Sequence, residues 1–492
     1  MSKAERRVLF LELNELTWSV IDRLIAEGRM PAFEKLKREG TWASPESVDQ
    51  PPHLDPWITW VTVHTGVDRS THGASVLEQD SSTIHAKRSW DYVVDAGKSV
   101  GVFGSISAYP PRPVPGFMVP GPFAPGDQTY PAYAMPIQAL NRKYTQVHHK
   151  NAGEDGPLSM VKAGVELMGL GLKPRTVARV LAQLARERVK PHDYWRRVVL
   201  QPLLNYDFFE KLYTRYRPHF ATWHSNHAAH FMHHYWRAWD DSKFTAKASP
   251  EEKQKYGEAL PYGYEIADEI LGNFMKLVDD DTVLVVATSM GQQPYVADLF
   301  PEGRIVVRFK DIKRLLDFMG IEGVTEIVPT MVPQYNVKIP DPQKRKRAIE
   351  LLGKAHCTGN ARPQTFFVEE TGEILTITPG GLDRPNPDLR YFFPDVAKAK
   401  PSGYDLEEFF VCDTPTPKQG MHHPTGVLGI WGRGINAGVE LKDTTNLDIL
   451  PTVLTLLGIP VPSHLPGRVL GQAWGDETAR ARVAQPSAVA QA

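Results

Sequence analysis

The stretch Val8-Leu9-Phe10-Leu11-Glu12-Leu13, which runs into Asn14-Glu15, determines the fold class of this chain. All of its residues except Glu12 are apolar, as in a short buried strand. The residues that follow carry apolar side chains at helical spacing, and Gly28 ends that helix. A strand that leads into a helix indicates an α/β sheet, and such sheets bind their ligands beside the carboxyl ends of their strands. We therefore expect Asn14 and Glu15 to lie in a binding site.

Two later segments also place polar residues next to an apolar run. Residues 281–288 form a buried strand that is followed by Ser289 and Gln292. His422-His423 comes shortly before the apolar run 427–432. Because these side chains can all form hydrogen bonds, they favour a shared polar site at the edge of the sheet.

The length of 492 residues exceeds what one simple core usually holds, so we expect a large domain with insertions. Residues 127–218 are predicted to form a largely helical insertion, in which Val177, Val180, Leu181 and Leu184 share one helix face. Residues 306–418 mix short helices with a hairpin at 364–377, and are predicted to form a second, α+β insertion. Segments 1–126, 219–305 and 419–475 then form the core, and 476–492 form a disordered tail.

The composition narrows the possible partners. The net charge is -1, which argues against a broad surface for nucleic acid or for an anionic membrane. Cys357 and Cys412 are the two cysteines and form no CxxC pattern, so thiolate metal sites and disulfide frameworks are not expected. The apolar run that ends at Leu11 is too short for a signal-peptide core, and no stretch reaches membrane-spanning length. We expect a cytoplasmic protein without a nucleic-acid or membrane partner, and its oligomeric state stays open.

The segment Trp223–Trp236 contains five of the 17 histidines. If it becomes helical after Trp223, Asn226 and His230 lie one turn apart, and His227 lies near His230. Neutral imidazole binds transition metals, so such a helix predicts metal ligands with supporting neighbours. The alternative for any one of these histidines is packing or hydrogen bonding beside the aromatic side chains.

Asp55-Pro56 predicts the start of a helix that ends at Gly66. Asp55 takes the cap position and Pro56 the first helical position. In one interpretation this is a capped, tryptophan-rich core helix. In the other, the N–H groups and the positive dipole end at Asp55 bind a phosphate or another oxyanion.

A series of motifs extends over nearly the whole chain. It comprises Leu13–Trp18 with Gly28–Pro31, Thr65-Gly66 with His72-Gly73, Tyr109-Pro110-Pro111 with Gly116–Met118, the histidine segment with Arg237, the strand 281–291, His422–Gly426, and Asp448–Thr452 with Leu457-Gly458. In this order and spacing the motifs resemble the alkaline phosphatase superfamily, and within it the type I phosphodiesterases and nucleotide pyrophosphatases. The resemblance implies a central, mostly parallel sheet flanked by helices. It also implies two metal ions that activate a Ser or Thr nucleophile and hold a phosphoryl group.

The sequence departs from this family at the metal and nucleophile positions. Asn14 replaces the aspartate of the first strand, and Ser289-Met290 replaces an Asp-His pair. Asn226 replaces a second aspartate, whose histidine partner corresponds to His230. The late histidine corresponds to His422. The nucleophile position falls on Asp55 or Pro56, and a shift is needed to reach the hydroxyl of Thr59.

These departures remove one metal position and keep the other. A dication beside Asn14, Ser289 and Met290 would lack anionic ligands. The second position keeps His230, His422 and Asn226, and could recruit His227, Glu15 or Asp55. We therefore predict at most one divalent metal, zinc or manganese.

Three functions follow as alternatives. The first is a divergent phosphodiesterase-like or phosphatase-like hydrolase or transferase, acting on a small anionic phosphate ester or activated metabolite. The second is a metal-independent biosynthetic transferase with a histidine base, and the third is a pseudoenzyme with a binding or scaffolding role. In the first, Asp55 or Thr59 is the nucleophile and His423 or His64 the acid or base. The residues expected to bind substrate are Asn14, Glu15, His64, His227, Ser289 and Gln292.

Overall fold

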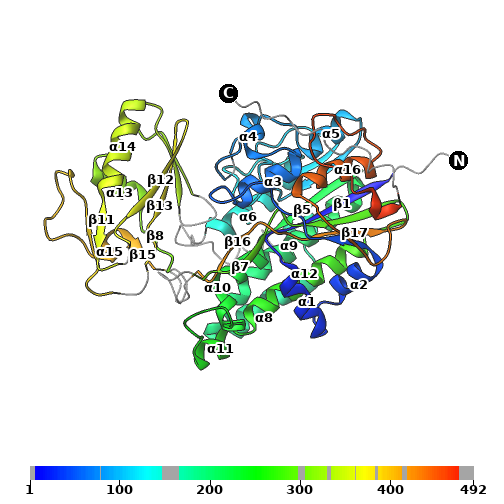
Figure 1. Ribbon diagram of the computed structural model, residues 1–492, viewed down its shortest axis with the longest axis horizontal. Coiled ribbons are helices and arrows are strands. Elements are labelled where there is room, and N and C mark those ends of the chain that lie inside the picture. The colour runs from blue at the N-terminus through cyan, green and yellow to red at the C-terminus, as the bar shows by residue number, and fades with distance from the viewer. Residues whose placement is uncertain are drawn as a thin grey trace.

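The computed structural model describes residues 6–77, 79–146, 166–296, 305–329, 334–360, 362–382, 386–412 and 418–475. The predicted tail, 476–492, lies outside the described residues. Figure 1 shows a large unit that contains the first and the last described segments, and a smaller unit beside it, built from residues around 305–411.

An eight-stranded sheet organises the large unit, in the order β18-β2-β17-β6-β1-β5-β3-β4. Its strands are β1 (Arg7–Leu13), β2 (Thr41–Ala43), β3 (Val100–Phe103), β4 (Gly116–Val119), β5 (Phe220–Ser225), β6 (Thr282–Ala287), β17 (Leu428–Gly432) and β18 (Val439–Leu441). All pairings are parallel except those of β17 with β6 and β2. The predicted α/β class with a mostly parallel sheet is confirmed.

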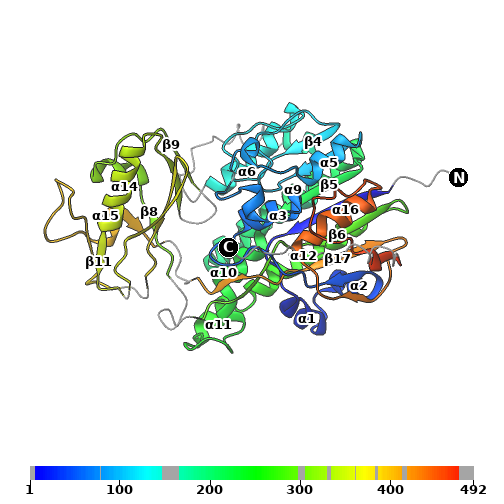
Figure 2. The ribbon, with the colours of Figure 1, turned by 45° about the horizontal axis from the view of Figure 1, so that its top comes forward.

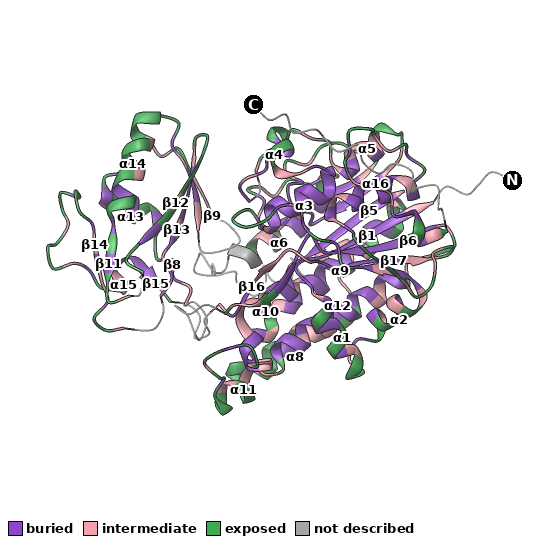
Figure 3. Cartoon of the chain, viewed as in Figure 1, coloured by how far each residue is buried: buried purple, intermediate pink, exposed green. Residues whose placement is uncertain are grey.

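The alternation of side chains along β1 explains the two layers of helices. Leu9, Leu11 and Leu13 join the core with α1 (Trp18–Ala26), α2 (Pro31–Glu39), α9 (Leu200–Tyr216), α10 (His227–Trp239) and α12 (Ala259–Met275). Val8 and Phe10 join the opposite core with α3 (Pro56–Thr65), α5 (Ser89–Asp95) and α16 (Ile449–Leu456). Glu12 points to this second face and is fully buried. Figure 3 shows the buried sheet between these layers.

Shorter helices complete the large unit. They are α4 (Arg69–His72), α6 (Met135–Gln146), α8 (Pro174–Val189) and α11 (Pro250–Tyr256), with 3-10 turns at Ser81–Thr83, Ala132–Ala134, Pro191–Val199, Asn446–Asp448 and Gly471–Trp474. The predicted apolar face of α8 does not face the core. Leu181 is 60% exposed, whereas Thr176 and Gln183 are buried, because α8 lies at the periphery of the large unit.

The smaller unit has an apolar core of its own. It contains β8 (Arg308–Phe309), α13 (Ile312–Met319), β9 (Glu326–Pro329), β10 (Tyr335–Lys338), α14 (Pro342–Lys354), β11 (His356–Thr358), β12 (Phe366–Thr371), β13 (Ile374–Pro379), β14 (Arg390–Phe392), α15 (Leu406–Phe409) and β15 (Phe410–Val411). Its main sheet has the order β12-β13-β10-β9. The predicted hairpin is confirmed as the antiparallel pair β12 and β13.

A two-stranded ribbon lies between the smaller unit and the sheet of the large unit (Figure 2). It pairs β7 (Gly291–Pro294) with β16 (Gly420–His423) in antiparallel register, with His422 opposite Gln292. The backbone N–H of Tyr295 donates to the carbonyl of Gln419 at 2.7 Å and extends this pairing. The chain therefore leaves and re-enters the large unit at neighbouring points.

Candidate metal centre

Glu15, His233 and His422 bring three ligand atoms within 4.8 Å of one another. Glu15 follows β1, His233 lies in α10, and His422 lies in β16. The Glu15 Oε2 atom lies 3.2 Å from His233 Nε2 and 3.6 Å from His422 Nε2. The Glu15 side chain is 2% exposed, and those of the two histidines are 17% and 20% exposed. The Glu15 carboxylate is therefore shielded from solvent, whereas solvent partly reaches the rings of the two histidines.

The backbone at Glu15 adopts a conformation that is rare for a residue with a side chain. Its φ is 66°, in the left-handed region. Such a conformation costs about 1–3 kcal/mol and is concentrated at functional sites. The conformation is stabilised here because both carboxylate oxygens of Glu15 accept hydrogen bonds. Oε1 accepts from Asn14 Nδ2 at 2.8 Å, and Oε2 accepts from Gln292 Nε2.

Both histidines are fixed in the tautomer that a metal requires. A carbonyl oxygen can only accept, so the ring nitrogen beside it carries the proton. His233 Nδ1 donates to the Gly420 carbonyl at 2.9 Å, and His422 Nδ1 donates to the Leu54 carbonyl at 2.7 Å. In a neutral ring this leaves the Nε2 lone pair available, and Nε2 is the atom that faces Glu15. Hydrogen bonds of this kind orient histidine ligands in metal sites.

The protonation states also match those of metal ligands. Burial lowers the pKa of His422 to about 4, so its ring is neutral at pH 7. For Glu15, burial alone would raise the pKa, but His422, His233 and the hydrogen bond from Gln292 outweigh it and lower the pKa to about 2. One carboxylate with two imidazoles is a ligand set of catalytic zinc sites and of open non-haem iron sites. The residues at this position therefore fit a divalent metal.

Asn14 supports the centre through hydrogen bonds that involve both the oxygen and the nitrogen of its side-chain amide. Its Oδ1 accepts from Trp60 Nε1 at 2.8 Å. Its Nδ2 donates to Glu15 Oε1 at 2.8 Å and to Asn226 Oδ1 at 2.6 Å. Asn14 was expected to donate to a substrate, but its N–H groups are directed at Glu15 and Asn226. An aspartate at this position would place a second negative charge beside Glu15, which explains why an amide is suitable here.

Replacing Asn14 by leucine is expected to lower the zinc affinity of the protein by about 10–100-fold, the usual effect of losing a group that orients a ligand. Glu15 Oε1 would lose its donor and the side chain would gain freedom. Competition with a chromophoric chelator measures this affinity. Asn205→Leu, at a buried position in α9, is the matched control and should bind zinc as the native protein does. Unchanged affinity in Asn14→Leu would remove Asn14 from the support of the centre.

Asp55 lies beside the centre at the start of α3. It occupies the cap position before Pro56, and Gly66 ends the helix with φ 67°, as predicted. Its side chain makes no capping hydrogen bond, is 28% exposed, and lies 3.5 Å from His422 Nδ1. Burial raises the pKa of Asp55 to about 7, with a contribution from Glu15 that Lys418 opposes. The carboxylate thus lies beside the Nδ1 side of the His422 ring, whose Nε2 faces Glu15, and does not cap the helix.

Thr59 and Ser289, also expected in the site, form a buried pair. The Thr59 hydroxyl lies 2.7 Å from Ser289 Oγ, and both residues are at most 1% exposed. Because its hydroxyl is enclosed and already bonded, Thr59 is a poorer nucleophile candidate than the partly exposed Asp55.

The histidine segment contributes a different residue to the centre than expected. The ligand in α10 is His233, whereas the ring of His230 packs against His234 with centroids 4.6 Å apart. His227 is buried, with Ser225 Oγ 2.7 Å from Nδ1 and the Gly263 carbonyl 3.1 Å from Nε2. Both nitrogens of His227 are therefore used inside the protein.

The remaining expected residues are distributed around the centre. His422 is one of its three potential ligands, as predicted. Gln292, expected to bind substrate, holds Glu15 and also donates to the Ala229 carbonyl at 3.2 Å. His423 Nδ1 accepts from the backbone N–H of Thr425 at 3.1 Å, in the turn after β16. Asn226, expected as a metal ligand, accepts from Asn14 through its Oδ1.

A second cluster, of one glutamate and two histidines, lies on the α3 side of β1. Glu12 Oε1 is 3.2 Å from His64 Nε2, and Glu12 Oε2 is 3.2 Å from His224 Nδ1. Ser105 Oγ donates to Glu12 Oε1 at 2.8 Å. Burial alone would raise the pKa of Glu12, but His64 and His224 lower it to about 2. His64, expected to bind substrate, is thus 1% exposed and is part of this buried cluster.

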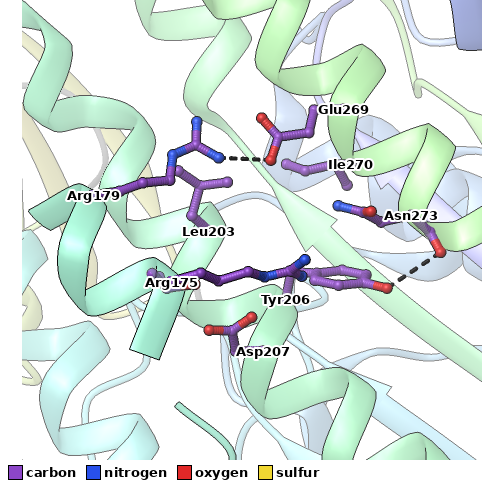
Figure 4. A pocket seen from close by; sticks show the side chains of 9 residues that line it. Arg175, Arg179, Leu203, Tyr206, Asp207, Glu269, Ile270 and Asn273 are labelled. Carbon is purple, nitrogen blue, oxygen red and sulfur yellow. Dashed lines mark hydrogen bonds and ion pairs between the residues drawn. The ribbon is translucent and has the colours of Figure 1, made fainter. Parts of the chain in front are cut away.

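A separate pocket lies among α8, α9 and α12 (Figure 4). Arg175, Arg179, Tyr206 and Glu269 contribute to its lining. Arg179 pairs with Glu269 at 2.6 Å, so the charge of this arginine is balanced within the pocket. The lining contains none of the three clustered ligands, and we assign no chemistry to this pocket.

Neither a known protein family nor a curated protein matches this chain. Within the described part of the chain, no helix has both the length and the apolar character needed to cross a membrane.

Proposed function

We propose that the protein is a one-metal hydrolase or transferase that acts on phosphate esters, as a divergent relative of the alkaline phosphatase superfamily. The observation that carries this proposal is the convergence of Glu15, His233 and His422 beside Asp55. The metal position implied by Asn14 and Ser289-Met290 is replaced by one built on the neighbouring Glu15. Zinc is the metal that this ligand set favours. Manganese, the other metal expected from the sequence, is tested beside it.

The roles follow from the positions of the side chains. When bound, a divalent ion supplies positive charge to the phosphoryl oxygens and to the attacking oxygen. Asp55 accepts the proton of the attacking water or alcohol, because its carboxylate is partly exposed beside His422 and is not used as a cap. The positive end of α3 favours an anionic group at the same place. Asn14 and Gln292 keep Glu15 in position throughout the reaction.

The test is hydrolysis of bis(p-nitrophenyl) phosphate and of p-nitrophenyl phosphate by protein loaded with zinc or manganese. Asp55→Asn is expected to lower kcat by about 100–10,000-fold, the usual contribution of a general base. Its zinc affinity should stay close to that of the native protein. Thr59→Val, which changes the buried hydroxyl one turn further along α3, is the matched control and should keep most of the activity. Full activity in Asp55→Asn would exclude Asp55 as the base.

The same experiment separates the two alternatives. Equal activity of metal-free and metal-loaded protein toward an activated donor would indicate a metal-independent transferase. Tight zinc binding without turnover of any ester or activated donor would indicate a binding role.

A further inference from the structure

The helix α8 turns its apolar side chains to solvent and not to the core. Leu181, Ala185 and Val189 follow one another at intervals of four residues, and Leu184 comes three residues after Leu181, so all four lie on one side of the helix. All four are exposed, and Val189 is 81% exposed. Arg188 follows Leu184 by four residues and is also exposed. These five residues form the outer face of α8.

Contacts on the inner side of α8 hold the helix in this orientation. The side-chain amide of Gln183 donates to the Glu187 carboxylate at 2.7 Å and to the Asp193 carbonyl at 3.0 Å. Arg179 pairs with Glu269 of α12 at 2.6 Å (Figure 4). A rotation of α8 that buried its outer face would break these contacts. The exposure of the apolar side chains is therefore a consequence of how α8 packs.

The exposed apolar surface is concentrated around α8. Nine large apolar side chains stand out as exposed among the described residues, and five of them lie between residues 168 and 194. These five are Met168, Leu181, Leu184, Val189 and Tyr194. Single exposed apolar residues are ordinary, whereas a group of them in one segment indicates an interaction surface.

The same segment carries a surplus of positive charge. Residues 168–197 contain eight lysines and arginines but only two acidic residues, Glu187 and Asp193. Both acids are largely buried, while their partners Arg197 and Arg186 are about half exposed. The acids therefore lie inward and the cations outward, so this side of the large unit presents positive charge to solvent.

Two further cations lie at the end of α8. Arg188 and Lys190 are exposed, and neither forms an ion pair within the described part of the chain. The net charge of -1 argues against a broad basic surface, but it does not exclude this local one, because the surplus is offset elsewhere in the sequence.

We propose that the outer face of α8 binds the surface of an anionic lipid membrane, with the helix lying in the plane of the interface. Leu181, Leu184 and Val189 enter the boundary between headgroups and acyl chains, and Arg188 and Lys190 contact the lipid phosphates. This proposal is independent of the function proposed above, because none of these residues belongs to the metal centre.

Charge and shape favour lipid over the other possible occupants. A second copy that packed through the same face would bring the exposed cations of one α8 close to those of the other, and like charges repel. A protein partner is usually held by large aromatic or arginine anchors that fill pockets. The outer face is instead a helix surface with two leucines, one valine and one alanine, which suits fluid lipid.

The experiment is co-sedimentation of the full chain with vesicles of phosphatidylcholine alone, and with vesicles of about three parts phosphatidylcholine to one part phosphatidylserine. The native protein should bind the second kind at least about tenfold more tightly, and added salt should weaken this binding. The double variant Arg188→Gln, Lys190→Gln should bind about 30-fold more weakly, as expected for two cations at an anionic surface. Leu181→Ser with Val189→Ser should weaken binding by at least about tenfold, since two apolar side chains no longer enter the lipid.

Matched controls use exposed residues away from α8. Lys346→Gln with Arg347→Gln removes two exposed cations from α14, and Val296→Ser removes an apolar side chain that is as exposed as Met168. Both controls should bind vesicles as the native protein does. Circular dichroism and zinc binding should be native in every variant, because only exposed side chains are changed.

Absence of binding of the native protein to vesicles with phosphatidylserine would overturn the proposal. Binding that persisted unchanged in both α8 variants would also overturn it, because another surface would then hold the lipid. Sedimentation velocity tests the second copy: a dimer that Leu181→Ser with Val189→Ser dissociates, without vesicle binding, would assign the outer face to self-association. A monomer that binds neither kind of vesicle would exclude lipid and leave an acidic protein as the occupant.

Discussion

Replacing Glu15 by glutamine is expected to lower the zinc affinity of the protein by more than about 100-fold, because even the loss of an outer support costs 10–100-fold. The substitution removes the one carboxylate of the ligand group and leaves the two imidazoles. An amide oxygen supplies neither the charge nor the basicity of a carboxylate toward a dication. Metal-dependent ester hydrolysis should be lost with it.

Chelator competition and elemental analysis of the purified variant measure this effect. Glu27→Gln is the control, since Glu27 is an exposed residue paired with Arg23 on the surface of the large unit. It should retain the zinc content of the native protein. If Glu15→Gln kept one zinc per chain at native affinity, the metal would bind elsewhere. That result would contradict the function proposed for this centre.

Replacing Glu12 by alanine is expected to lower the free energy of unfolding by about 3–5 kcal/mol, as when one partner of a buried charged cluster is removed. His64 and His224 lose the carboxylate between them, and Ser105 loses its acceptor. All of these groups are at most 7% exposed, so water cannot replace the lost contacts without rearrangement. Urea denaturation followed by circular dichroism measures the change.

The contribution of Glu12 to the free energy of unfolding also decreases as the pH falls. Its pKa in the folded protein is about 2, below the ordinary value of 4.5. The unfolded chain therefore binds the proton first, and the stability that Glu12 provides is complete above pH 4.5. That stability is lost as the pH falls from 4.5 toward 2. Glu12→Ala should show a smaller loss of stability over this range than the native protein, and an identical acid profile would contradict the assignment.

Part of the sheet could be predicted because strands such as β1 and β6 are buried runs of seven and six residues. β1 and β6 read as apolar stretches, and the helix between Pro56 and Gly66 has clear start and stop residues. β2 and β18 have three residues each, which is too short for a periodic pattern. The strand at 427–432 was predicted, but its antiparallel direction depends on pairing with β6, which no local pattern encodes.

The centre could be predicted only in part, because the rotation of α10 is set by tertiary packing. His422 and Glu15 stood out through their positions next to strands. His230 and His233 lie three residues apart, so either could face the sheet edge. The choice depends on how α10 packs on α12, where a Cβ at Gly263 would lie 2.3 Å from the ring of Phe231. This close fit fixes the helix so that His233 reaches the Glu15 carboxylate.

The orientation of the Asn14 side chain explains why its role differs from the predicted one. The sequence placed it correctly after β1, and an exposed amide there would bind an anion. Trp60 lies on α3, and its indole N–H orients the amide toward Glu15. That contact joins residues 46 positions apart, so no local pattern could reveal it.

The pairing of β7 with β16 brings together the two points at which the chain enters and leaves the smaller unit, so that this unit could be replaced as a whole. Pro294 lies opposite Gly420, and strands this close are joined in hairpins by loops as short as about two residues. Recombination between these two points could replace everything from Tyr295 to Gln419 and leave Glu15, His233 and His422 in the chain. The whole smaller unit could then be exchanged as one module, while the three potential metal ligands at the sheet edge are retained.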